Sequence, residues 1–121
     1  DGTEVQQVLD ITKGKGAEAV IDFVGEKGST KKGLDMTRPA GNYYIVGYGE
    51  NIVIPTVDLI FTERNIIGNL VGTWADLNEL MSLADRGLVH LATAEYSLKD
   101  ADKALHDLNA GKVKGRAILI P

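Results

Sequence analysis

Three apolar runs in this chain end in the same dipeptide, Val-Gly, at residues 24–25, 46–47 and 71–72. The glycines are 22 and 25 residues apart (47 − 25 and 72 − 47), about the length of one strand, one helix and two short loops. Runs this apolar favour strands buried on both faces of a parallel sheet. A glycine at each strand end permits a sharp turn and a close approach, and ligands of open α/β sheets bind at that edge.

Length and composition limit the classes of protein to which the chain can belong. The chain has 121 residues, one domain's worth, and a net charge of −4, which argues against a broad nucleic-acid surface. No apolar stretch approaches the roughly 20 residues of a membrane span, and no signal-peptide pattern begins the chain. Because there is no cysteine, disulfides and thiolate metal sites are excluded, and a cytoplasmic location is expected. We expect neither a nucleic-acid nor a membrane partner.

Apolar spacing along the chain predicts alternating helices and strands, hence an α/β fold. We expect helices over 4–12, from Gly28-Ser29 to Pro39-Ala40-Gly41, over 58–62 and 73–86, and from Ser97 or Lys99 to Gly111. We expect strands over 20–24, 43–46, 65–71, 93–98 and 116–120. Pro55 keeps the short extended piece 52–55 out of a central strand position.

The helix over 73–86 carries the strongest local signals. Thr73 is a good N-cap, and Asp76 stands three residues on, where a capping box places an acid. Its apolar residues recur at helical spacing and predict a buried face. That face comprises Leu77, Leu80, Met81, Leu83 and Ala84.

Four segments follow one another in a characteristic order: residues 16–25, 39–47, 65–73 and 96–121. The first three are similar to the fourth, fifth and sixth cofactor-domain strands of the medium-chain dehydrogenase/reductase superfamily. The last resembles that superfamily's closing helix and strand, and is most similar to the zinc-dependent alcohol dehydrogenases. The resemblance implies the C-terminal half of a doubly wound Rossmann-type parallel sheet, plus a closing strand-helix-strand segment. Residues 1–89 would belong to the NAD(P)-binding domain, and residues 90–121 would return to the catalytic domain.

The resemblance also indicates parts that this sequence lacks. The superfamily's first βαβ unit carries a Gly-x-Gly-x-x-Gly turn, whereas Gly14-Lys15-Gly16 here has Ala19 at the third glycine position and leads into a strand. That unit, the acid that selects NAD over NADP, and the Cys and His ligands of zinc are expected before Asp1. We therefore expect the chain to be a piece of a longer protein, with no catalytic residue and no metal ligand of its own.

The candidate cofactor-binding residues are those that the resemblance places beside the nicotinamide or the phosphates. Backbone groups and valines would meet the nicotinamide ribose and carboxamide, the third run would fix which ring face meets the substrate, and an arginine would approach the phosphates or ribose. The competing interpretations are turn glycines, core packing and a solvated arginine. The candidates are Val24, Gly25, Val46, Gly47, Tyr48, Leu70, Val71 and Arg116.

Other polar residues favour structural interpretations. Asp22 sits inside the first apolar run, where a structural hydrogen bond to a neighbouring loop is favoured over a catalytic acid. His90 and His106 lack the spacing of a metal site and are expected at the surface. The basic cluster of Lys27, Lys31, Lys32 and Arg38 is expected to be a solvated helix face, with an adenine-side phosphate site as the alternative.

The resemblance implies a fragment of an oxidoreductase that moves hydride between NAD or NADP, with NAD slightly favoured, and an alcohol, aldehyde or ketone. Zinc would belong to the longer protein, and this chain would be inactive alone. Alternatives are a zinc-free quinone oxidoreductase or enoyl reductase, and a non-catalytic dimerisation or binding module. A methyltransferase-type domain is disfavoured because its acidic-Gly-x-Gly-x-Gly start is absent. Residues 65–71 are expected to form an edge strand that pairs two copies into a dimer or higher oligomer.

Overall fold

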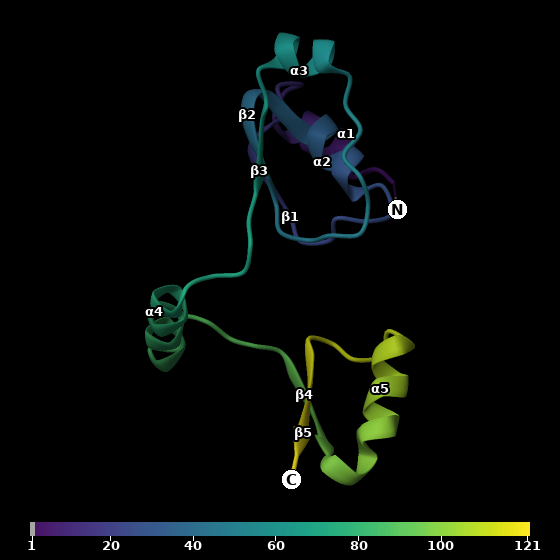
Figure 1. Cartoon of the computed structure of the whole chain (residues 1–121), viewed down its shortest axis with the longest axis vertical. Coiled ribbons are helices and arrows are strands. Elements are labelled where there is room, and N and C mark those ends of the chain that lie inside the picture. Colours follow the sequence, from purple (N-terminus) through teal and green to yellow (C-terminus); the bar gives the residue numbers. More distant parts are fainter. Residues whose placement is uncertain (1) are drawn as a thin grey trace. The chain divides into compact units, whose positions relative to one another are not determined.

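The computed structural model describes residues 2–121 and contains two compact units. The first unit extends to Val71, and the second comprises Gly72–Pro121 (Figure 1). This division separates compact units of the chain; the expected domain boundary at residue 89 concerns the longer protein and stays a prediction. Among residues 2–121, no helix has both the length and the apolar character needed to cross a bilayer.

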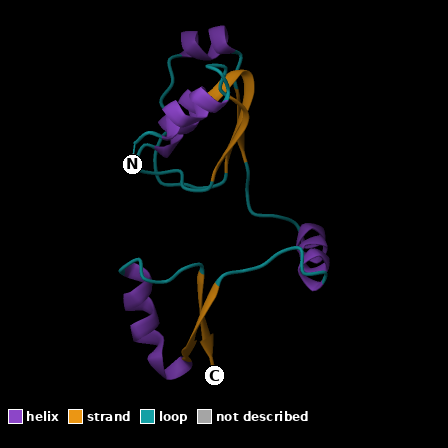
Figure 2. Ribbon diagram, turned by 180° about the vertical axis from the view of Figure 1, so that it is seen from behind, coloured by secondary structure: helices purple, strands orange, loops and turns teal. Residues whose placement is uncertain are grey.

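The first unit is an α/β structure, as the sequence predicts. Its elements are α1 (Glu4–Ile11), β1 (Ala17–Asp22), α2 (Ser29–Met36), β2 (Thr37–Ile45), α3 (Thr56–Thr62) and β3 (Asn65–Gly68). The strands form a parallel sheet in the order β1-β2-β3 (Figure 2). Ile21 is paired with Tyr44, and Tyr44 with Ile67, so the three strands end at the same edge.

The core of this unit centres on Tyr43, whose exposed fraction is 0%. Leu34 and Thr37 are buried beside it, and the Thr37 hydroxyl donates to the Gly33 carbonyl at 2.7 Å. Glycine at position 33 lets α2 lie directly against the Tyr43 ring, because a Cβ there would overlap the ring carbons. A helix and a strand are thus joined through one aromatic side chain.

The prediction that the strands are buried on both faces is wrong for the described residues. Val20 and Ile21 point in opposite directions from β1, and Ile21 is 56% exposed. The reason is that successive strand residues face opposite sides of the sheet, and α1 and α2, which contact each other, lie on the same side of the strands in Figures 1 and 2.

The second strand begins earlier than expected. Pro39-Ala40-Gly41, predicted to end the preceding helix, lies inside β2, while α2 already ends at Met36. The pairing register shifts here, with Ala17 opposite Thr37 but Ala19 opposite Asn42. Proline is tolerated because an irregularity of this kind leaves residues out of the hydrogen-bond ladder.

The third strand is shorter than the predicted 65–71, ending at Gly68. The Asn69 amide still donates to the Ile45 carbonyl at 2.8 Å, but Leu70, Val71 and Gly72 lie beyond the strand. Its predicted edge position is confirmed in the described sheet.

The second unit contains α4 (Trp74–Asp85), β4 (Thr93–Ser97), the 3-10 turn η1 (Leu98–Asp100), α5 (Ala101–Asn109) and β5 (Arg116–Ile120). Strands β4 and β5 pair in parallel. Helix α5 packs on them through buried Ala104, and the Lys103 ammonium lies 5.2 Å from the centre of the Tyr96 ring.

The capping box of α4 is confirmed: the Thr73 hydroxyl accepts from the Asp76 amide, and the Asp76 carboxylate accepts from the Thr73 amide. The predicted buried face is wrong, however, because Leu77, Leu80, Met81 and Leu83 are 39–58% exposed and Ala84 is only half-buried. An amphipathic pattern predicts a helix locally, but its burial depends on a partner surface, which the described residues do not supply.

Replacing Gly33 by alanine tests the Tyr43-centred core. The added Cβ would lie 2.9 Å from ring atom Cζ, and we expect a loss of about 2 kcal/mol in the free energy of unfolding from overpacking. Far-ultraviolet circular dichroism during urea unfolding measures it. Gly68→Ala is the matched control, because nothing lies within 4 Å of its Cβ position; equal losses in the two variants would contradict the prediction.

Candidate functional site

The candidate site is the sheet edge formed by the segments that follow β1, β2 and β3. Because the strands are parallel and adjacent, residues 23–28, 46–51 and 69–71 leave the sheet at the same edge. Seven of the eight predicted cofactor-binding residues lie in these segments. They are Val24, Gly25, Val46, Gly47, Tyr48, Leu70 and Val71.

Asp22, the last residue of β1, organises this edge through both of its acceptor groups. Its side-chain Oδ1 accepts from the Val24 and Gly25 amides at 2.8 and 3.0 Å. Its main-chain carbonyl accepts from the Val46 and Gly47 amides at 2.8 and 2.9 Å. One residue therefore holds the amides of the first two Val-Gly pairs.

The second carboxylate oxygen of Asp22 binds the interior. Oδ2 accepts from the Tyr43 hydroxyl at 2.7 Å and from the Ser29 hydroxyl at 2.8 Å, which ties β1 to β2 and to the first turn of α2. Burial alone would raise the pKa of Asp22, but these hydrogen bonds and those from Gly25 and Val24 outweigh it and lower the pKa. Burial, and then the Asp22 carboxylate, raise the pKa of Tyr43.

These contacts make Asp22 a structural carboxylate, as its surroundings in sequence predict. A group that accepts four side-chain hydrogen bonds has filled its roughly four lone-pair sites. The sequence did not identify Tyr43 and Ser29 as its partners, because they lie 21 and 7 residues away and meet it only through the fold.

The first two Val-Gly glycines are required because the two turns touch. A Cβ on Gly25 would lie 2.5 Å from the Tyr48 amide nitrogen, and a Cβ on Gly47 would lie 2.5 Å from the Val24 amide nitrogen. Gly25 also has a φ of +62°, which disfavours other residues. Gly72 differs, since the nearest atom to its Cβ position is Asp76 Oδ2 at 3.4 Å. The three dipeptides are therefore alike in sequence but not in role.

The side chains of the edge are apolar and open. Tyr48, Leu70 and Val71 are 93%, 89% and 91% exposed, and Val24 and Val46 are also exposed. Val71 has a φ of +38°, a rare conformation for a β-branched residue. Because Asp22 binds the amides of Val24, Gly25, Val46 and Gly47, the groups left open there are the valine side chains rather than these amides.

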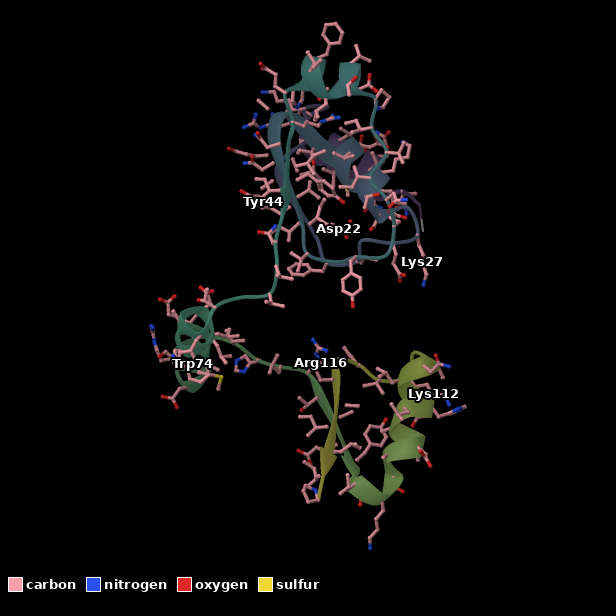
Figure 3. All side chains as sticks on the ribbon, viewed as in Figure 1. Asp22, Lys27, Tyr44, Trp74, Lys112 and Arg116 are labelled. Carbon is pink, nitrogen blue, oxygen red and sulfur yellow. The ribbon has the colours of Figure 1, made fainter. Side chains whose placement is uncertain are left out.

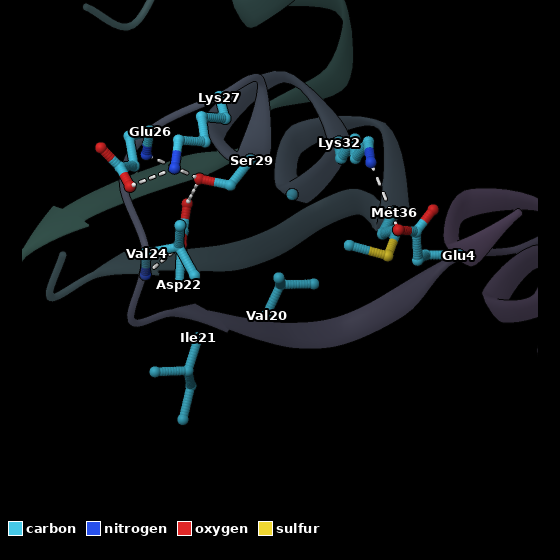
Figure 4. Close-up of a pocket in the computed structure, with 11 residues that line it drawn as sticks. Glu4, Val20, Ile21, Asp22, Val24, Glu26, Lys27, Ser29, Lys32 and Met36 are labelled. Carbon is cyan, nitrogen blue, oxygen red and sulfur yellow. Dashed lines mark hydrogen bonds and ion pairs between the residues drawn. The ribbon is translucent and has the colours of Figure 1, made fainter. Parts of the chain in front are cut away.

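A pocket of about 310 Å³ lies next to this edge, between β1 and helices α1 and α2 (Figure 4). Its apolar lining includes the side chains of Val20 and Met36. Polar pairs stand at its two ends: Lys32 with Glu4 at 3.2 Å, and Ser29 with Asp22. Since both pairs are already hydrogen-bonded, the pocket presents binding surface rather than a reactive group.

The remaining predicted residues lie elsewhere. Arg116 is exposed at the first position of β5 in the second unit (Figure 3), so its role toward the first unit stays a prediction. His90 and His106 are exposed, as expected. The cations of the basic cluster each have a carboxylate partner, which agrees with a solvated surface. The pairs are Lys27–Glu26, Lys31–Asp35, Lys32–Glu4 and Arg38–Glu18.

Comparison with known proteins identifies the family. Residues 1–86 match the zinc-binding dehydrogenase family. The chain belongs to this family. The resemblance to medium-chain, zinc-type alcohol dehydrogenases is thereby confirmed.

Individual members of the zinc-binding dehydrogenase family agree. An NAD-dependent alcohol dehydrogenase of Sulfolobus acidocaldarius is 35% identical over 117 residues, which cover 94% of this chain and 34% of that protein. The crystal structure of an alcohol dehydrogenase from Aeropyrum pernix matches 99% of this chain and 35% of its own, with a TM-score of 0.91 and 35% identity. A Pseudomonas syringae quinone oxidoreductase structure matches 97% of this chain and 39% of its own, with a TM-score of 0.76 and 27% identity. The chain thus spans about a third of the length of the relatives it matches.

The described residues of this chain do not form a zinc site. Within 2–121, the structure brings together no group of three or more His, Cys, Asp or Glu side chains able to hold a metal ion. The carboxylates of the edge are engaged by hydroxyl and amide donors instead. No step of a mechanism can be assigned to a metal held by these residues.

Replacing Asp22 by asparagine tests its role as organiser. We expect a loss of about 2–3 kcal/mol in the free energy of unfolding at pH 7, because several hydrogen bonds to a buried charge are broken. Since the pKa of Asp22 is lowered on folding, the wild-type advantage is complete above the unfolded-state pKa of about 3.9 and is lost as pH falls through the lower folded-state pKa.

Urea unfolding at a series of pH values measures this difference. Asp35→Asn is the control, because Asp35 is exposed and pairs only with Lys31 at the surface, a contact worth about 0.5 kcal/mol. A pH-independent difference between Asp22→Asn and the wild type would contradict the assignment.

Proposed function

We propose that this chain is the C-terminal part of a longer NAD(P)-dependent, alcohol dehydrogenase-like enzyme, and that it supplies part of the nicotinamide pocket. The observation that carries the proposal is the edge built around Asp22, where exposed apolar side chains border two turns in backbone contact. The similarity to alcohol dehydrogenases over 94–99% of the chain supports it. The substrate of the whole protein would be a small alcohol, aldehyde or ketone.

The bound cofactor would supply the hydride acceptor or donor, and the residues of the chain would hold it in place. Val24 and Val46 would pack against the nicotinamide ring, and carbonyls of the same turns would accept hydrogen bonds from its carboxamide. Leu70 and Val71 would limit which ring face meets the substrate. Arg116 would pair with the phosphates or ribose.

NAD is the favoured cofactor because the relative from Sulfolobus acidocaldarius is described as NAD-dependent. Zinc would be held by other parts of the longer protein, where a metal would polarise the substrate oxygen. A cytoplasmic location stays a prediction from the cysteine-free sequence.

A zinc-free quinone oxidoreductase is the second candidate, and the quinone oxidoreductase structure that matches the chain with 27% identity favours it. The two candidates share the edge around Asp22 and differ in metal ligands outside this chain. A non-catalytic module that only dimerises or binds a partner is the third, and cofactor binding separates it from both enzymes.

Cofactor binding by the 121-residue chain tests the proposal. We expect NAD to raise the melting temperature slightly, because a ligand that binds only the folded state stabilises it, while NAD with ethanol shows no turnover. Adenosine diphosphate ribose, which lacks nicotinamide, is the matched ligand control and should raise it less. Equal shifts with both ligands, or none with either, would contradict a nicotinamide pocket here, and turnover would contradict the expected inactivity.

The open edge of β3 is proposed to pair two copies. The Asn69 amide points toward β2, so by alternation the Gly68 amide points to the open edge. Gly68→Pro removes that donor and is expected to convert dimers or higher oligomers to monomers in sedimentation velocity. Gly68→Ala, which keeps the amide, should stay associated. A wild-type chain that is strictly monomeric at high concentration would refute the pairing.

A further inference from the structure

Glu50, a residue that the sequence patterns do not single out, joins two turns of the edge through its side chain. Its Oε2 accepts from the Gly28 amide at 2.8 Å. Its Oε1 accepts from the Thr30 amide at 3.0 Å and from the Thr30 hydroxyl at 2.6 Å. The carboxylate therefore binds the N-terminal turn of α2, where unpaired amides favour an anion.

The main chain of Glu50 makes a second connection between the same turns. Its amide donates to the Gly25 carbonyl at 2.8 Å. Both ends of the turn over 46–50 are thus attached to the segment that runs from the end of β1 into α2. At one end, the Val46 and Gly47 amides bind the Asp22 carbonyl. At the other end, Glu50 binds Gly25, Gly28 and Thr30. Tyr48 and Gly49, between these attachments, are exposed.

The charged side chains of the β1–α2 turn, those of Glu26 and Lys27, do not join the two turns in this way. The Glu26 carboxylate lies 3.4 Å from the Lys27 ammonium of the same turn. In contrast, Glu50 reaches donors 20 and 22 residues away in the sequence. Its bonds to the Thr30 hydroxyl, and then to the Gly28 and Thr30 amides, lower the pKa of Glu50.

We propose that Glu50 is a positioning residue, whose carboxylate holds the turn over 46–50 against α2 and thereby fixes the Val46–Tyr48 backbone that borders the nicotinamide. The part of this inference that concerns nicotinamide rests on the proposed function. The part that concerns the turn rests on the contacts of Glu50 alone.

Glu50→Gln is the decisive substitution, because it keeps the length and shape of the side chain. Gly28 donates to one carboxylate oxygen and Thr30 to the other. An amide has one oxygen and one NH₂ group, so a donor faces a donor in either orientation. Glu26→Gln is the matched control, since it removes the same charge from a carboxylate that pairs with Lys27 and keeps the main-chain hydrogen bonds of Glu26 to Ser29 in α2.

Hydrogen exchange measured by NMR at single amides separates positioning from simple helix capping. A capping role would change protection only at Gly28 and Thr30, which Glu50 touches. A positioning role predicts at least tenfold faster exchange at Val46 and Gly47 as well, although Glu50 does not bind them, while Tyr43 in the core keeps its protection. Glu26→Gln should leave all of these amides unchanged.

NAD titration of the same samples supplies the functional readout. We expect about tenfold weaker binding by Glu50→Gln, as for loss of one charge-assisted hydrogen bond, and unchanged binding by Glu26→Gln. Unchanged exchange at Val46 and Gly47 would overturn the positioning role, whatever happens to NAD. Faster exchange with unaltered NAD affinity would overturn its link to nicotinamide.

A wild-type chain that binds no NAD would instead overturn the proposed function, and the exchange rates would still decide the positioning role. If Glu50→Gln does not fold, Thr30→Val replaces it, because valine keeps the branched shape and removes only the hydroxyl donor. A smaller acceleration at Val46 and Gly47 is then expected, and none would refute the role.

Discussion

The first unit depends on a single buried carboxylate placed at the end of a strand. Asp22 accepts four hydrogen bonds through its side chain and two through its carbonyl, and these reach β2, both turns of the edge and the first turn of α2. A buried charge without hydrogen-bond donors around it would be costly in free energy, so the ionised Asp22 carboxylate depends on these donors. The amides of the exposed edge are thereby bound from beneath, while its apolar side chains stay exposed.

This arrangement explains why the turns can approach so closely. Gly25 and Gly47 leave no side-chain atoms between the two backbones, and the amides that would otherwise be unsatisfied there are directed to Asp22. Glu50 adds a second, outer attachment to α2. Asp22, through its carboxylate and its carbonyl, and Glu50, through its carboxylate and its amide, thus connect the same two turns.

Membership of the zinc-binding dehydrogenase family gives these features a context. The chain spans about a third of its relatives, and the described residues hold no cluster of metal ligands. Within that third, the side chains open to a ligand are apolar, whereas the nearby carboxylates are engaged in structure. The role that we propose for this part is therefore to hold and orient a cofactor.

Local signals in the sequence determined much of this protein. Alternating apolar periods predicted the α/β order, Thr73 and Asp76 predicted their capping box, and Asp22 was recognised as structural, because each of these signals lies within a short stretch of sequence. The tertiary structure alone decided that Tyr43, Ser29 and Glu50 belong to the edge, that Pro39 lies in a strand irregularity, and that the apolar face of α4 stays exposed. Those outcomes depend on which surfaces meet in the folded chain, and an apolar or acidic residue does not by itself specify its partner.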